Sequence, residues 1–304
     1  MIIQFTKETK MRTNINLPLY HVEHFIFPFI DGAFACKNGM FLDGFFLVDS
    51  GSSDNVFNQE AVHLLSDESI SGDKRMVCAV NNEGEDCVLA DVKIKVGDIE
   101  CIERFSISQN LDFKSMFGDN CIIGVLGAGF MRKHGLALDY AKQCVRTSEL
   151  ITFSEKGKSF VCPMDGGFYA YGIPLVCLTN GEDDLLCVAD SGCNTSTLTQ
   201  YAMEKVARGF ERIDGQQSMH TISGEAITNL AKVDFTLLSV YDDVTKCSLV
   251  SDTDVFQIIT GQEHICWCEN KEIPPISGLI SSEFMLRNKW ILDFNVGYIY
   301  VDVA

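Results

Sequence analysis

The sequence predicts an all-β protein with a few short helices, built as two similar lobes in tandem. Three observations support this: a duplicated Asp-Ser-Gly segment, a second duplicated block further along each copy, and alternating apolar and polar residues between them. The length of 304 residues fits two domains or two lobes of one domain. We expect an N-terminal lobe over residues 1–156 and a C-terminal lobe over residues 157–304, divided within the polar stretch 154–158.

The first duplicated element is a short apolar run that ends in Asp-Ser-Gly. Residues 45–53 read FFLVDSGSS and residues 185–193 read LLCVADSGC, with their aspartates 141 residues apart (190 − 49 = 141). A short, continuous apolar run is typical of a buried strand. An Asn-Gly pair precedes each aspartate, at Asn38-Gly39 and at Asn180-Gly181. Such a pair predicts a tight hairpin in which both turn residues have positive φ.

The second duplicated element combines a glycine block with a following strand. Residues 124–131 (GVLGAGFM) align with residues 278–285 (GLISSEFM), and residues 138–140 (LDY) align with residues 292–294 (LDF). The offset here is 154 residues (284 − 130 = 154), which is 13 more than between the two Asp-Ser-Gly segments. We therefore expect an insertion of about 13 residues in the second copy, within the polar, proline-containing stretch 260–275.

Between these landmarks the residues are mostly of strand type. Residues 88–96 and 231–237 alternate between apolar and polar side chains, as half-buried strands do, and Gly97-Asp98 turns the chain after the first of them. Each copy also has two short segments that we expect to be helical. These are residues 60–65 and 130–134 in the first copy, and residues 200–206 and 282–287 in the second.

The composition excludes several classes of function. The net charge is −18 at pH 7, so the surface repels phosphate backbones and we expect no nucleic-acid partner. The longest apolar stretch, residues 121–131, has 11 residues and three glycines, whereas a membrane span needs about 20 residues. No apolar run follows the N-terminal basic residues, so we expect no signal peptide and no membrane partner. The 13 cysteines then indicate reduced thiols in a cytoplasmic protein.

The residues that carry chemistry are Asp49 and Asp190. Two copies of one β unit can meet across a two-fold axis, which would bring these carboxyl groups together. Two carboxylates a few ångströms apart cannot both ionise readily, so the pair retains one shared proton over a wide pH range. The ionised member can take a proton from a water molecule, and the protonated member can donate to a carbonyl oxygen. Gly51 and Gly192 would let the two backbones approach closely.

These segments resemble the aspartic peptidases of the pepsin and retropepsin group, in a single-chain, two-lobed form. The matched motifs are LVDSGS at residues 47–52, VADSG at 188–192, IIG at 122–124 and ISG at 276–278. The resemblance implies the acid-protease fold: two tandem retropepsin-like β-barrel lobes related by a pseudo-two-fold axis, with a substrate cleft between them. It also implies an endopeptidase that cuts extended peptides, uses no cofactor or metal, and forms its catalytic pair within one monomer.

The resemblance also assigns supporting roles around the aspartates. The residues expected to support the pair are Ser50, Gly51, Ser52, Ser191, Gly192 and Cys193. A flap hairpin that binds substrate should follow each aspartate. The flap tips are expected at Asn81, Asn82 and Gly84 in the first copy and at Ser223 and Gly224 in the second. Neither flap carries the tyrosine of pepsin-like enzymes, so the chain is more similar to retropepsins.

Several positions depart from the family pattern. Serine replaces the usual threonine after each aspartate, which keeps the hydroxyl and loses the methyl group that stiffens χ1. Ser277 stands where the family has an apolar residue. Cys193 is the counterpart of Ser52, a serine that hydrogen-bonds the catalytic carboxylate in pepsin-like lobes. These departures keep open a second hypothesis, a peptide-binding protein with weak or no catalysis on the same fold.

Two further groups of residues are interpreted as having no catalytic role. Asp139 and Asp293 repeat in register, but they belong to a strand that the family places outside the active site. His264, Cys266 and Cys268 combine a Cys-x-Cys pair with one histidine. They lack a fourth ligand and the usual zinc spacing, so we expect no metal site there.

Overall fold

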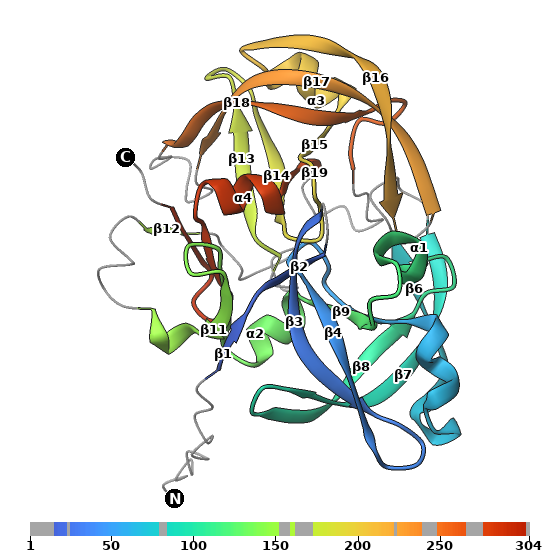
Figure 1. Ribbon diagram of the computed structural model, residues 1–304. Coiled ribbons are helices and arrows are strands. Elements are labelled where there is room, and N and C mark those ends of the chain that lie inside the picture. The colour runs from blue at the N-terminus through green and yellow to red at the C-terminus, as the bar shows by residue number, and fades with distance from the viewer. Residues whose placement is uncertain are drawn as a thin grey trace, which may run out of the picture.

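The computed structural model describes residues 15–22, 25–78, 84–151, 159–161, 173–221, 224–238, 248–265 and 276–301. These residues form mostly strands with a few short helices, arranged as two lobes and a sheet to which both halves contribute (Figure 1). The strands of the first lobe, blue to green, and those of the second, yellow to red, occupy opposite parts of the molecule. The all-β, two-lobed architecture predicted from the sequence is confirmed.

The first lobe is an eight-stranded sheet that curls until β3 pairs with β7 as well as with β4. Its strand order is β2-β3-β4-β9-β5-β8-β7-β6. The strands are β2 (Tyr20–Val22), β3 (Phe25–Ala35), β4 (Phe41–Asp49), β5 (Asn55–Phe57), β6 (Ile70–Cys78), β7 (Gly84–Val96), β8 (Ile99–Ile107) and β9 (Ile122–Gly127). The additional pairing gives this sheet its barrel-like form.

The second lobe repeats this plan with seven strands. Their order is β13-β14-β19-β15-β18-β17-β16, and β13 also pairs with β17. The strands are β13 (Leu175–Thr179), β14 (Asp184–Asp190), β15 (Thr197–Thr199), β16 (Gly209–Thr221), β17 (Gly224–Leu238), β18 (Ser248–Ile259) and β19 (Ile276–Ser281). Counted from β3, the two orders correspond strand by strand, with β13 equivalent to β3 and β16 equivalent to β6. The duplicated sequence therefore folds into two copies of one topology.

A third sheet of six strands joins the two halves, in the order β1-β11-β10-β20-β21-β12. Its strands are β1 (Asn16–Pro18), β10 (Leu136–Asp139), β11 (Cys144–Thr147), β12 (Ser159–Val161), β20 (Ile291–Asp293) and β21 (Tyr298–Tyr300). At its centre β10 and β20 pair antiparallel with Leu138 opposite Leu292. These are equivalent residues of the duplicated LDY and LDF segments, so the pseudo-two-fold axis passes through this pair.

Aromatic side chains fill both lobes. In the first lobe the buried rings of Phe57 and Phe105 pack edge to face with their centroids 5.6 Å apart. In the second lobe Phe235 and Phe256 pack in the same way at 5.3 Å. The cluster of buried apolar residues continues from one lobe to the other through the six-stranded sheet. This shared core fixes the lobes relative to each other, because neither can shift without exposing apolar surface.

The four predicted helices are present, and the described residues include three further short helices that the sequence did not predict. The helices are η1 (Gln59–Leu64), η2 (Asp67–Ser69), α1 (Phe113–Phe117), α2 (Ala128–Lys133), η3 (Ser148–Leu150), α3 (Gln200–Val206) and α4 (Ser282–Arg287). The segment expected to be helical at 60–65 is a 3₁₀ helix. Helix α1 was not predicted, because five residues are too few for a periodic signal, although Asp112 caps it by accepting a hydrogen bond from the Ser115 N–H.

Both predicted hairpins are present, but their turns differ from the expected type. Only Gly39 and Gly181 have positive φ, at 79° and 99°, whereas the two-residue turn would require it of the asparagines as well. Both turns are longer than two residues, since β4 begins only at Phe41 and β14 only at Asp184. Asn180 instead accepts hydrogen bonds from the N–H groups of the next turn residues through its side chain, which gives asparagine a role without positive φ.

Some predicted features fall outside the described residues. These are the lobe boundary at 154–158, most of the insertion at 260–275, and the flap tips at Asn81, Asn82 and Ser223. Among the residues that the structure does describe, no helix is long and apolar enough to cross a membrane.

Candidate active site

The two Asp-Ser-Gly turns lie against each other at the junction of the lobes. Asp49 is the last residue of β4 and Asp190 the last residue of β14. A Cβ atom at Gly51 would lie 2.6 Å from Oδ2 of Asp190, and a Cβ atom at Gly192 would lie 2.6 Å from Oδ1 of Asp49. Any side chain at either glycine would therefore collide with the opposite carboxyl group. Because they have no side chain, the two glycines leave room for the carboxyl groups of the opposite turns.

Four reciprocal hydrogen bonds hold the turns together. The Ser50 N–H donates to Oγ of Ser191, and the Ser191 N–H donates to Oγ of Ser50, both at 2.8 Å. The Ser50 hydroxyl donates to the carbonyl oxygen of Ala189 at 2.6 Å, and the Ser191 hydroxyl to that of Val48 at 2.7 Å. Both serines are fully buried. Serine thus supplies the hydroxyl contacts between lobes that the family obtains from threonine.

The first residue of a helix donates a hydrogen bond to each aspartate turn. Strand β4 runs parallel to β9, which continues into α2, and β14 runs parallel to β19, which continues into α4. The Ala128 N–H donates to the carbonyl oxygen of Ser52, and the Ser282 N–H donates to that of Cys193, both at 2.8 Å. These are equivalent bonds in the two lobes. Both duplicated sequence blocks therefore position the aspartates.

The carboxyl groups of Asp49 and Asp190 hydrogen-bond to each other. Burial raises the pKa of Asp190 well above its ordinary value, and the neighbouring Asp49 raises it further. Burial also raises the pKa of Asp49, but the hydrogen bond from Asp190 and the N–H groups of Gly51, Ser52 and Gly192 oppose that shift. Burial therefore favours protonation of both carboxyl groups, and the pair retains one shared proton over a wide pH range.

The two residues that follow the glycines differ in their contacts. Ser52 donates its N–H to Oδ1 of Asp49 at 3.1 Å, while its hydroxyl donates to the carbonyl oxygen of Asp54 at 2.8 Å. The expected hydroxyl contact with the carboxylate is thus replaced by a backbone contact. Cys193 likewise donates its thiol to the carbonyl oxygen of Thr195. Burial and the nearby Asp190 raise the pKa of this thiol, so it remains protonated.

A cleft of about 300 Å³ opens above the aspartates. Residues from both lobes line it, including Val77 of the first flap hairpin (β6 and β7) and Met219 of the second (β16 and β17). Cys78 pairs with Gly84, and Thr221 with Gly224, at the described ends of these hairpins. The described parts of these hairpins therefore border the cleft from opposite lobes.

One wall of the cleft is largely aromatic, a feature that the sequence did not predict. It consists of Phe27 on β3 together with Phe113, Met116 and Phe117 on α1. The ring of Phe117 packs edge to face against Phe27, with their centroids 5.6 Å apart. Residues 113, 116 and 117 have the spacing of one helix face, but five residues are too few for that spacing to predict a helix from the sequence. This wall makes the cleft suited to apolar side chains.

A buried tyrosine beneath the pair was also missed. Tyr140 follows β10, and its hydroxyl lies 2.7 Å from Oγ of Ser282, at the start of α4 in the other lobe. Burial and the negative charges of Asp190 and Asp49 raise the pKa of Tyr140, so it stays neutral. The LDY segment was recognised as a repeat. Its second-lobe counterpart is Phe294, which has no hydroxyl, so the repeat gave no sign of this contact.

The other candidate residues lie away from the aspartates. Asp139 forms a buried ion pair with Arg146 in the six-stranded sheet, and Asp293 accepts a hydrogen bond from the Ser148 hydroxyl at 2.8 Å. Neither lines the cleft. His264 belongs to the described residues, whereas Cys266 and Cys268 do not.

Comparisons with known proteins bear on the fold. No family model matches the chain, and no curated protein does. Among solved structures, the crystal structure of the aspartic proteinase from Irpex lacteus matches with a TM-score of 0.55 and 10% sequence identity, covering 96% of this chain and 98% of that one. The chain has an aspartic-proteinase-like fold. At this identity the similarity concerns the fold alone, so any assignment of activity depends on the site.

Proposed function

We propose that the protein is an aspartic endopeptidase of the pepsin and retropepsin group, with its catalytic pair formed by Asp49 and Asp190 within one chain. One observation carries this proposal above all. Two aspartates from equivalent turns hydrogen-bond to each other at the floor of a cleft. A fold gains no stability from placing two like charges together, because the pair costs desolvation and repulsion. A catalytic role explains why both are there.

In the proposed reaction the two carboxyl groups have different roles. Asp49, ionised, takes a proton from a water molecule, which attacks the carbonyl carbon of the peptide bond. Asp190, protonated, donates its proton to the carbonyl oxygen and so stabilises the developing negative charge. The resulting gem-diol collapses as its nitrogen receives the proton held by Asp49 and one hydroxyl returns its proton to Asp190. One water is consumed, and both carboxyl groups end in their starting state.

The expected substrate is an extended peptide or protein segment with a bulky apolar side chain near the cleaved bond. The aromatic wall of Phe113 and Phe117 offers an apolar site close to the aspartates, and burial of one large side chain contributes about 1.5–3 kcal/mol. The flap hairpins have strand edges that can pair with an extended backbone. One chain is sufficient for this site.

The test is to incubate the full chain with a library of peptides and identify the products by mass spectrometry. We expect cleavage at internal bonds, best between bulky apolar residues. Asp49→Asn and Asp190→Asn should each reduce turnover by about 10²–10⁴-fold or more. The matched control is Asp43→Asn, since Asp43 lies exposed on the same strand as Asp49 and its variant should keep wild-type turnover.

Binding measurements separate this proposal from the alternative of a peptide-binding protein without catalysis. A statine-type mimic carries a hydroxyl in the place of the attacked carbonyl, so it should bind the wild type and lose affinity for both Asn variants. If peptides bind the wild type but none is cut, the binding protein is the correct reading. If either Asn variant retains near wild-type turnover, the proposed roles of the aspartates are wrong.

A further inference from the structure

A second group of reactive side chains lies in the first lobe, outside the cleft. Within the described part of the chain, one group of three potential metal ligands has all its ligand atoms within 4.8 Å of one another: Cys101, Glu103 and His134. Cys101 and Glu103 are two residues apart on β8, so their side chains lie on the same face of the strand. His134 ends helix α2. None of the three lines the cleft above the aspartates.

The separations of the three ligand atoms lie within about 0.3 Å of those in a tetrahedral metal centre. Sγ of Cys101 lies 3.4 Å from Oε1 of Glu103 and 3.9 Å from Nε2 of His134. The third separation, from Nε2 of His134 to Oε1 of Glu103, is 3.0 Å. Zinc bonds of about 2.3 Å to sulfur and 2.0–2.2 Å to nitrogen or oxygen place tetrahedral ligands roughly 3.3–3.6 Å apart.

We propose that Cys101, Glu103 and His134 form a binding site for a zinc-like divalent cation, with a fourth position open to water. A thiolate, an imidazole and a carboxylate together favour zinc over the hard cations magnesium and calcium, which prefer oxygen ligands. Metal binding replaces the hydrogen bonds that Cys101, Lys133 and His134 form with Oε1 of Glu103. The Cys101 thiol proton leaves to solvent, and His134 binds as the neutral tautomer protonated at Nδ1.

The second lobe supplies an internal comparison, because the same place in its fold is occupied by different residues. Ser106 lies opposite Val56, which pairs with Val125, and Gln257 lies opposite Thr197, which pairs with Leu279. Val125 and Leu279 occupy the same position in the duplicated glycine block. Ser106 on β8 is therefore the equivalent of Gln257 on β18. Counting back along the strands, the equivalents of Cys101 and Glu103 on β8 are Asp252 and Asp254 on β18. The helix offset of 154 residues makes Arg287 and Asn288 the equivalents of Lys133 and His134.

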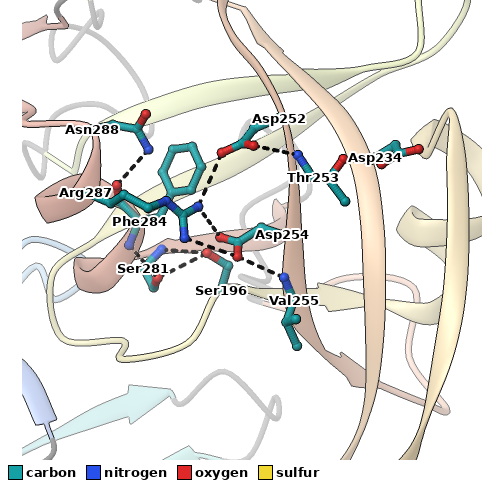
Figure 2. A network of polar contacts seen from close by, with 10 residues as sticks. All are labelled: Ser196, Asp234, Asp252, Thr253, Asp254, Val255, Ser281, Phe284, Arg287 and Asn288. Carbon is teal, nitrogen blue, oxygen red and sulfur yellow. Dashed lines mark hydrogen bonds and ion pairs between the residues drawn. The ribbon is translucent and has the colours of Figure 1, made fainter.

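In the second lobe these positions form an ordinary ion-pair cluster (Figure 2). The Arg287 guanidinium lies 2.9 Å from Asp254 and 3.3 Å from Asp252, and it stacks over the Phe284 ring at 5.3 Å. Asn288 donates its side-chain N–H to the carbonyl oxygen of Phe284. Charge balance and helix capping explain this set, and none of its members is a thiol or an imidazole.

The first lobe replaces that set with metal-binding side-chain types. Lys133 pairs with Glu103 at 2.6 Å, which repeats the lysine-or-arginine to carboxylate contact of the other lobe. Cys101 stands in place of Asp252, and His134 stands in place of Asn288. The ring of His134 packs against that of Phe130, with their centroids 4.6 Å apart. The carboxylate of Glu103 is only 8% exposed, whereas Lys133 is 55% exposed. The Lys133 ammonium group can therefore leave Oε1 of Glu103 when a metal binds there, because it remains in contact with water.

The test measures metal binding directly and needs no proteolytic activity, so its outcome is independent of the proposed function. The full, reduced chain is titrated with Co²⁺ and with Zn²⁺ against a chromophoric chelator. The double variant C101D/H134N gives the first lobe the residue types found at equivalent positions of the second. We expect it to lose one equivalent of bound metal and the thiolate-to-cobalt absorption of a tetrahedral site. D252N, in the second lobe, should leave both unchanged.

A measurement on the unmodified protein covers the case in which the double variant fails to fold. Alkylation of each cysteine is followed by peptide mass spectrometry with and without Zn²⁺. Zinc should slow the alkylation of Cys101 at least tenfold and leave exposed Cys121 unaffected. The proposal is overturned if Cys101 is alkylated at the same rate with zinc present. It is equally overturned if a folded C101D/H134N binds as much metal as the wild type.

Discussion

The reciprocal hydrogen bonds between the two aspartate turns allow a quantitative prediction for Ser50→Ala. This substitution removes the donor to the Ala189 carbonyl oxygen and the acceptor for the Ser191 N–H, both in a fully buried place. A lost hydrogen bond costs about 1 kcal/mol, and a buried polar group left without a partner costs about 1–3 kcal/mol. We expect the free energy of unfolding to fall by about 2–4 kcal/mol. Urea unfolding followed by circular dichroism measures it.

The symmetry of the contact makes the prediction more exacting. Ser191→Ala removes two bonds of the same kind, to Val48 and from Ser50, so the two variants should cost the same within about 0.5 kcal/mol. Ser53→Ala is the matched control, because its hydroxyl makes one bond of 3.2 Å at a half-buried site, and it should cost less than about 0.5 kcal/mol. A cost below about 1 kcal/mol for Ser50→Ala, or clearly unequal costs for the two serines, would refute the reasoning.

Three other predictions concern the acids and the cleft cysteine. Because the pKa of Asp190 is raised, its contribution to stability is complete below the ordinary aspartate pKa of about 3.9 and is lost as the pH rises through the raised value. From pH 4 to 7 the free energy of unfolding of Asp190→Asn should therefore rise relative to that of the wild type, and equal pH slopes would contradict this. Cleavage should have a bell-shaped pH profile on the acid side of neutral. Arg146→Met leaves the buried carboxylate of Asp139 without its cation and should cost about 3–5 kcal/mol in urea unfolding, part of which Asp139→Asn should restore. Iodoacetamide should slowly abolish the proposed peptide cleavage by alkylating Cys193, whose pKa is raised, and a bound statine-type inhibitor should protect this thiol. Loss of activity in Cys193→Ser at the wild-type rate would disprove the role of the thiol.

The duplication in the sequence was sufficient to predict the architecture. Two Asp-Ser-Gly segments and two glycine blocks in the same order indicated two copies of one β unit, and the strands, hairpins and helix α4 lie where the pattern placed them. These features are local: an apolar run of strand length, a glycine with positive φ and a short amphipathic helix each follow from residues close together in the chain. The same duplication predicted that Asp49 and Asp190 would meet across a two-fold axis, and the family resemblance implied the same pair.

Other features depended on contacts between distant residues. The exchange of hydrogen bonds by Ser50 and Ser191 joins positions 141 residues apart. The cluster of Cys101 and His134 joins a strand to a helix end 33 residues away, with no spacing typical of a metal motif. Helix α1 was too short to be predicted, yet it forms the aromatic wall of the cleft. None of these residues is unusual in its own segment.

The sequence by itself determined the two-fold repeat, the strands that end in aspartate and the glycines that permit their approach, because periodicity and backbone conformation depend on neighbouring residues. Only the tertiary structure decided how burial raises the pKa of the two aspartates, which residues line the cleft and which side chains gather around Glu103. Burial and electrostatic coupling depend on what surrounds a group in space. That surrounding is made by residues from both halves of the chain, and it exists only once the two lobes have packed together.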